Sequence, residues 1–348
     1  MNITKFQIKN FRSHQNKQFN FVKGVNVLVG NNGVGKTNVV EAIHYLSLAR
    51  SFRGTDDEDL IKRDTDLAEI DAIVNQGNIS KQIKVLITKN GRKVFINGKP
   101  INKLSELSNS VNVIVFEPKD VLMFRGLPKV RRNFLDISLS KKSPVYLEYI
   151  SRYEKILKKR NDILKSGEVD MTLLEANTEL LIQTSETIVN YRVVYMKDIN
   201  DILNKITRAL AHEDVKVEVI YKPYITPNQN FYHDAKNAYK RALESDLKNK
   251  ATTIGVHRED FSINLNGREI GTFGSQGENR LVALALKLTP YFLIEDEDKK
   301  PIVVLDDVMS ELDSSHQKHL LEFIQKFDQL FITSTKPIGD NLTSYPLK

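Results

Sequence analysis

The chain has 348 residues, of which 41% are hydrophobic and 27% are charged, so we expect a globular protein with a sizeable core. It contains no cysteine, which excludes disulfides and cysteine-ligated metals. Its apolar runs are too short to cross a bilayer, so we expect a cytoplasmic protein. Its length suits two domains, or one domain with a large insertion.

The first third of the chain predicts strands and one helix. Residues 25–30 and 111–116 are short apolar runs typical of buried strands, and residues 36–49 carry apolar side chains at helical spacing. Residues 81–98 alternate around an Asn-Gly pair, which predicts a β-hairpin. This part of the chain should therefore form an α/β fold.

The middle of the chain changes character, because residues 131–165 and 171–211 contain almost no helix breakers. A helix of forty residues would be about 60 Å long. After residue 253 strands and helices alternate again. We therefore predict an α/β domain in two pieces, residues 1–117 and 251–348, with a mostly helical arm inserted at 118–250.

The strand at 25–30 leads into the segment GNNGVGKT (30–37), and a helix follows. This satisfies the P-loop pattern G-x-x-x-x-G-K-[ST] in its strand–loop–helix context, where backbone N–H groups and a helix N-terminus bind phosphates. Lys36 would reach the β- and γ-phosphates, and Thr37 would ligate Mg²⁺. The alternative is an incidental glycine turn. The predicted nucleotide-binding residues here are Gly30, Asn31, Asn32, Gly33, Val34, Gly35, Lys36, Thr37 and Asn38.

A second carboxylate segment, PIVVLDDVMSELD (301–313), predicts a buried strand that ends in two aspartates. Asp306 would orient Mg²⁺, and Asp307 would hold the attacking water, so Asp307 and Lys36 are the expected catalytic residues. The alternative is that the two aspartates cap the following helix.

The segment TFGSQGENRLVALALKL (272–288) places a polar, glycine-containing turn at a helix start. Alone it would be an ordinary helix start. Together with the two preceding motifs it resembles the signature of ABC-type ATPases. That resemblance implies that Ser275, Gln276 and Gly277 complete the nucleotide site of a second subunit, and that the SELD segment (310–313) crosses the dimer interface.

Longer segments resemble the RecF recombination-mediator family, namely ITKFQIKNFRSHQNKQFNF, PKDVLMFRGLPKVRRNFLD, GVHREDFSINLNG and VVLDDVMSELDSSHQKHL. The resemblance implies a split P-loop ABC-type ATPase head with an inserted helical arm, and a weak DNA-stimulated ATPase that uses ATP and Mg²⁺. It implies an ATP-dependent homodimer at DNA gaps or single-strand/double-strand junctions, with RecR and RecO as partners in loading RecA. Arg12 would approach the nucleotide by analogy. Most ABC-type ATPases have Glu where this chain has Asp307, so the resemblance to that class implies slow hydrolysis.

Positive charge is concentrated between residues 119 and 165, where thirteen Lys and Arg face five Asp and Glu. Such a surplus favours a polyanionic partner, although a solvated helix face would give the same pattern. For Arg131 and Arg132 the alternative is ion pairing with carboxylates such as Asp136. The predicted DNA contacts are Arg131, Arg132, Lys158, Lys159 and Arg160.

Three other functions remain open at this stage. An SMC-type chromosome clamp would need far longer coiled-coil arms than this insertion allows. A transporter energising subunit usually carries a histidine after the strand that follows the aspartates, where this chain has Thr333, Ser334 and Thr335. An ATPase that regulates another DNA enzyme, such as a nuclease or a toxin, is the third.

Overall fold

The computed structural model describes residues 1–339 and 341–348, without the side chains of Ser105 and Glu311. The chain divides into two compact units: unit 1 is Met1–Val121, Lys205–Val215 and Gln276–Lys348, and unit 2 is Leu122–Asn204 and Lys216–Ser275. The first boundary lies close to the sequence-based one at residue 117. The boundary expected at residue 250 differs, because β10 (Asp260–Leu265) pairs with β9 (Val217–Lys222) and holds the segment up to Ser275 in unit 2.

Unit 1 contains two sheets. The first is antiparallel, with the order β2-β1-β4-β5-β6-β7. Its strands are β1 (Asn2–Phe11), β2 (His14–Asn20), β4 (Leu67–Gln76), β5 (Ile79–Thr88), β6 (Gly91–Ile96) and β7 (Lys99–Pro100). The second is parallel, with the order β14-β3-β13-β12-β8. Its strands are β3 (Gly24–Val29), β8 (Val113–Phe116), β12 (Ile302–Leu305), β13 (Gln329–Ser334) and β14 (Thr343–Pro346). The carboxyl ends of these parallel strands share one edge.

Helix α1 (Lys36–Leu48) lies inside the core of unit 1. Nine consecutive residues of this helix, from Val39 to Ser47, are buried. One hydrophobic cluster joins α1 to residues of β1, β4 and β5 in the first sheet and of β8, β12 and β13 in the second. Because both sheets hold α1, the loop that precedes the helix has a fixed position.

Unit 1 also contains shorter helices. The α-helices are α2 (Leu104–Ser110), α8 (Gln276–Phe292) and α9 (Ser314–Phe323). The 3₁₀ helices of this part of the chain are η1 (Asp57–Leu60), η4 (Glu297–Lys299), η5 (Met309–Glu311) and η6 (Ile324–Lys326), and η2 (Pro118–Phe124) crosses into unit 2. Helix α9 begins at Ser314 because Asp313 caps it, its side chain accepting from the backbone N–H of His316 at 2.9 Å.

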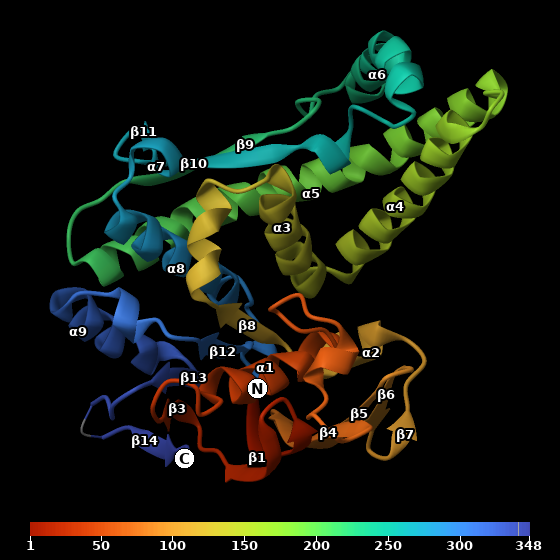
Figure 1. Cartoon of the computed structure of the whole chain (residues 1–348). Helices are drawn as coiled ribbons and strands as arrows, with labels where there is room; N and C mark the ends of the chain where they lie inside the picture. The colour runs from red at the N-terminus through yellow and green to blue at the C-terminus, as the bar shows by residue number, and fades with distance from the viewer. Residues whose placement is uncertain (340) are drawn as a thin grey trace. The chain divides into compact units, whose positions relative to one another are not determined.

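Unit 2 is mostly helical, as the sequence predicts. Its helices are α3 (Pro128–Lys142), α4 (Pro144–Lys165), α5 (Met171–Ala211), α6 (Phe231–Asn249), α7 (Ile270–Phe273) and η3 (Val256–Arg258). A small sheet with the order β11-β10-β9 completes the unit, with β11 at Arg268–Glu269. Helix α5 has 41 residues and is the long green helix of Figure 1, with α4 folded back beside it; its last residues, from Lys205, belong to unit 1.

No helix in the described part of the chain combines the length and the apolar character needed to span a membrane.

Candidate nucleotide site

The loop between β3 and α1 has a backbone that requires glycine. Gly33 and Gly35 have φ of +86° and +93°, in the left-handed region. A Cβ added at Gly35 would lie 2.5 Å from His14 Nε2 and 2.8 Å from Ser13 Oγ, so a larger residue would collide with β2 and the turn before it. His14 Nε2 lies 3.0 Å from the carbonyl oxygen of Gly35, and burial lowers the pKa of His14, which favours a neutral ring that donates to this carbonyl.

Lys36 folds back over the loop. Its Nζ lies 2.6 Å from the carbonyl oxygen of Gly30 and 3.0 Å from that of Asn31. Asn38 also supports the loop region, because its Nδ2 donates to Ser13 Oγ at 2.9 Å. A cation and a helix N-terminus therefore converge on one glycine-rich turn, which suits a phosphate group.

Asp306 follows β12 and meets Thr37, although the two residues are 269 positions apart in the chain. The hydroxyl groups of Thr37 and Thr333 both donate to Asp306 Oδ1, at 3.1 and 2.9 Å. Burial raises the pKa of Asp306, and the nearby charge of Asp307 raises it further, while the two hydroxyl hydrogen bonds oppose this shift. A hydroxyl and a carboxylate side by side are hard oxygen ligands of the kind that Mg²⁺ prefers.

Asp307 is exposed, whereas Asp306 is buried. Its φ is +50°, its backbone N–H donates to Thr333 Oγ1 at 2.8 Å, and its Oδ1 accepts from Ser310 Oγ at 2.8 Å. Because Asp313 caps α9, the alternative in which Asp306 and Asp307 cap the next helix is wrong. Thr333 was not among the predicted site residues; only its place in a polar run after an apolar strand could have indicated it.

Arg12 is committed to protein groups. Its guanidinium donates to both carboxylate oxygens of Glu41 at 2.8 and 2.9 Å, to Thr55 Oγ1 at 2.7 Å and to the carbonyl of Asp59 at 3.0 Å. Arg53 lies 3.8 Å from the same buried Glu41 carboxylate and acts electrostatically on Asp306. A contact between Arg12 and nucleotide therefore stays a prediction, and Glu41 joins the site region as a residue that sequence reasoning missed.

Ser275, Gln276 and Gly277 are exposed. Helix α8 begins at Gln276, and Glu278 lies in its first turn. A Cβ built on Gly277 meets no atom within 4 Å. The chain passes from unit 2 back into unit 1 between Ser275 and Gln276. The sequence-predicted signature is thus a solvent-accessible helix start.

Two predicted DNA contacts serve the fold of unit 2. Arg131 donates from Nε and Nη2 to the two oxygens of Asp260, both at 2.7 Å, and from Nη1 to the carbonyls of Met123 and Gly126. Arg132 donates to the carbonyl of Glu259 at 2.8 Å. The ion-pairing alternative therefore describes Arg131, with Asp260 in place of Asp136.

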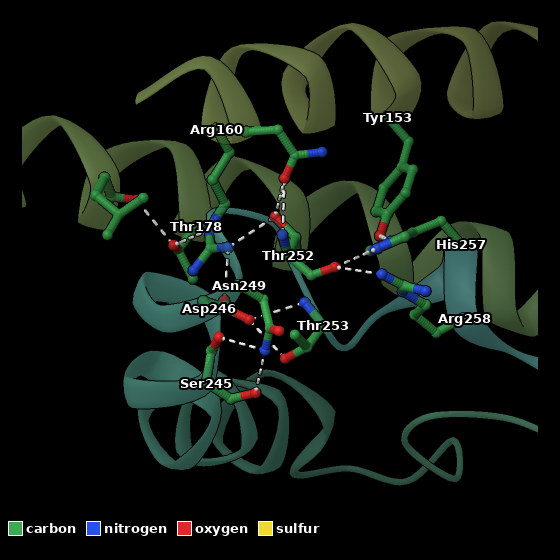
Figure 2. Close-up of polar contacts among 12 residues, drawn as sticks. Tyr153, Arg160, Thr178, Ser245, Asp246, Asn249, Thr252, Thr253, His257 and Arg258 are labelled. Carbon is green, nitrogen blue, oxygen red and sulfur yellow. Dashed lines mark hydrogen bonds and ion pairs between the residues drawn. The ribbon is translucent and has the colours of Figure 1, made fainter. Parts of the chain in front are cut away.

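The prediction that Arg160 contacts DNA is wrong. Its side chain is 1% exposed, and Nη1 lies 2.8 Å from Asp246 Oδ2 and 2.8 Å from Thr252 Oγ1 (Figure 2). A side chain with so little exposed surface has no face to present to a DNA backbone. Lys158 and Lys159, which directly precede Arg160 on α4, are exposed. Their predicted contact with DNA stays a hypothesis.

A glycine loop between a parallel strand and a buried helix, with a carboxylate from the next-but-one strand at its threonine, defines a P-loop ATPase head of the ABC type. A family model described as the RecF/RecN/SMC N-terminal domain matches residues 2–338. The chain belongs to this family and, within it, to the RecF family, because RecF proteins are at least 30% identical to it over nearly their whole length.

Two curated relatives illustrate the similarity. The chain is 34% identical to the "DNA replication and repair protein RecF" of Oceanobacillus iheyensis, covering 97% of this chain and 95% of the relative. It is 36% identical to the protein of the same name from Bacillus cytotoxicus, covering 97% and 93%.

Solved structures agree with the fold. The structure titled "recombination mediator protein RecF-ATP in RecFOR pathway" superposes with a TM-score of 0.88 at 31% identity, covering 99% of this chain and 95% of that one. An Smc head domain from Pyrococcus furiosus gives a TM-score of 0.60 at 17% identity, covering 96% and 89%, which shows a shared fold.

Proposed function

We propose that this chain is an ATP-dependent DNA-binding protein of recombinational repair that binds ATP and Mg²⁺ and hydrolyses ATP slowly. The contact of Thr37 and Thr333 with Asp306 carries the proposal, because it assembles both halves of a phosphate–metal site. The ATP-bound RecF structure to which this chain is similar supports the choice of nucleotide.

The residues present suit each part of the nucleotide. The glycine loop and Lys36 would hold the phosphates, and Thr37 with Asp306 would hold Mg²⁺, which neutralises phosphate charge when bound. Asp307 lies beyond the strand end, exposed and oriented by Ser310, where it would accept a proton from water. An aspartate is one methylene shorter than the glutamate of most ABC-type ATPases and holds water less closely, so turnover should be slow.

A second copy of the chain is the proposed partner across the nucleotide. Ser275, Gln276 and Gly277 are exposed at a helix N-terminus, which provides N–H and hydroxyl donors for an anionic phosphate. We propose that they complete the site of the second copy, so that ATP drives dimerisation at DNA gaps or junctions. RecR and RecO are the proposed partners in loading RecA, and the description of the similar RecF structures as part of a RecFOR pathway supports this choice.

Mixed dimers test the shared site. Lys36→Ala removes the P-loop cation, and Ser275→Arg blocks the signature, so each protein alone should lose ATP-dependent dimerisation and ATPase activity. A one-to-one mixture can form one intact composite site and should regain part of both activities, measured by light scattering and phosphate release with gapped DNA. A mixture as inactive as each variant alone would contradict the shared site.

A further inference from the structure

Unit 2 contains a cavity of about 400 Å³ bordered by α4, the first turns of α5, and α6. This volume lies within the range of about 300–1,000 Å³ that small-molecule sites occupy. Leu174, Ile182 and Leu243 supply apolar walls, and Tyr239 supplies an aromatic face. All of its lining residues belong to unit 2, and none of them belongs to the P-loop.

A buried cation forms part of the cavity wall. Arg160 is 1% exposed; its Nε donates to Thr178 Oγ1 at 2.8 Å, and its Nη1 donates to Asp246 and Thr252, as Figure 2 shows. Its guanidinium carbon lies 5.3 Å from the centroid of the Tyr239 ring. Among the described residues, no hydrogen bond engages the third nitrogen, Nη2. Because Arg160 lines the cavity and Nη2 is not used by a protein acceptor, Nη2 is available to an acceptor in the cavity.

The rim adds a second available donor. Lys236 lies 3.0 Å from Glu179 and 3.9 Å from Glu175, so this lysine is engaged by the acidic residues of the rim. Lys240, one helical turn further along α6, is exposed and has no ion pair within the described part of the chain. The groups left for a ligand are therefore two positively charged hydrogen-bond donors, Arg160 Nη2 and Lys240, next to apolar side chains.

We propose that this cavity binds an amphipathic organic anion. Its anionic oxygens accept hydrogen bonds from Arg160 Nη2 and from Lys240, and its apolar part packs against Leu174, Leu243 and the Tyr239 ring. Asp246 neutralises part of the Arg160 charge, so the anion adds a hydrogen bond to a site that stays folded without it.

The test uses the fluorescent anion 8-anilinonaphthalene-1-sulfonate with the full chain, at saturating ATP and Mg²⁺ so that the P-loop is occupied. Saturable fluorescence enhancement should be displaced by decanoate and not by decanol, which has a chain of the same length without the charge. Displacement by both to the same degree would overturn the anion site and leave an unselective apolar groove.

Three variants locate the binding. Lys240→Glu reverses the rim charge and should weaken dye binding about tenfold or more, and Thr172→Trp, at an exposed position of the cavity wall, should prevent displacement by decanoate. Lys248→Glu reverses an exposed charge on the same helix outside the cavity and should change neither property. Circular dichroism and the urea midpoint establish that each variant is folded. Equal dye affinity in the unmodified protein and in all three folded variants would show that the dye binds elsewhere, and it would refute the proposal.

Discussion

The guanidinium of Arg12 and the carboxylate of Glu41 form two parallel hydrogen bonds, from Nε to Oε2 at 2.9 Å and from Nη2 to Oε1 at 2.8 Å. Glu41 is fully buried on α1, one turn after Thr37, and it also accepts from Ser51 Oγ at 2.5 Å. One carboxylate therefore ties the turn after β1 and the loop after α1 to the helix that carries the P-loop threonine.

Replacing this carboxylate should destabilise unit 1 and loosen the P-loop. Glu41→Gln keeps the side-chain volume but leaves the Arg12 charge, with 16% of its side chain exposed, without its counter-charge. Breaking a buried pair on one side typically costs about 3–5 kcal/mol. We expect a loss of this order in urea unfolding and weaker ATP binding.

Asp66→Asn is the control for this prediction. It removes an ion pair with Lys89 in which the two side chains are 92% and 67% exposed, so no measurable loss of stability is expected. Similar unfolding midpoints for Glu41→Gln and Asp66→Asn would show that the buried pair between Arg12 and Glu41 does not stabilise unit 1.

Thr333→Val should lower ATP hydrolysis without unfolding the protein. The hydroxyl donates to Asp306 Oδ1 at 2.9 Å and accepts from the Asp307 backbone N–H at 2.8 Å, so its loss releases the Asp306 carboxylate and the backbone that positions Asp307. Groups that orient metal ligands are typically worth about 10–100-fold in metal affinity or activity. The measurement is the Mg²⁺ dependence of the hydrolysis rate. Thr333→Ser should restore activity, and Thr335→Val, at an exposed position, should have no effect; unchanged activity in Thr333→Val would contradict the orienting role.

His257 should make unit 2 sensitive to mild acid. Burial lowers the pKa of His257 from 6.5 to about 4, and its two ring nitrogens lie 2.9 Å from Tyr153 Oη and 3.0 Å from the Thr252 carbonyl. The unfolded chain then binds a proton that the folded chain does not, so stability is full above pH 6.5 and is lost progressively as the pH falls toward 4. At 1.36 kcal/mol per pKa unit the loss is about 3 kcal/mol.

Urea unfolding as a function of pH measures this effect. His257→Gln should flatten the dependence of the unfolding free energy on pH in that window, while His233→Gln, at an exposed position, should leave it unchanged. The same acid sensitivity in His257→Gln would assign the effect to other groups.

The basic run on α4 should separate into two roles. The double variant Lys158→Ala/Lys159→Ala should bind DNA more weakly for every sequence, and the slope of log affinity against log salt should fall by about 1 per lysine that contacts phosphate. Fluorescence anisotropy at several salt concentrations gives the slope. An unchanged slope would remove both lysines from the DNA interface.

Arg160→Ala should act on folding instead. It leaves the fully buried Asp246 carboxylate without its guanidinium partner, so we expect about 3–5 kcal/mol of destabilisation in urea. A stable Arg160→Ala protein with a selective loss of DNA binding would reverse this assignment.

Short-range chemistry explains what the sequence could predict. The P-loop spans eight consecutive residues, 30–37, whose roles follow from spacing, and the 171–211 helix follows from a run without Gly or Pro. The Asn-Gly pair between residues 81 and 98 likewise fixes the β5–β6 turn.

Long-range pairing explains what it could not. In the sequence, Arg160 is indistinguishable from the other cations of a basic run, because its partner Asp246 is 86 residues away. Glu41 reads as a solvent-facing acid on an amphipathic helix, because nothing near it in the sequence reveals that a second sheet covers α1. The β9–β10 pairing links segments on either side of α6, and for that reason the boundary expected at residue 250 missed the segment up to Ser275.

The uninterrupted course of α5 has a practical consequence for fragment design. Residues Met171–Asn204 of this helix belong to unit 2 and Lys205–Ala211 to unit 1, with no loop between them. Limited proteolysis, which needs locally extended backbone, has no cleavage point at that junction. A truncated protein that retains all of unit 1 must therefore begin a segment inside α5, at Lys205. It should be designed with a replacement helical cap at that point rather than a flexible spacer.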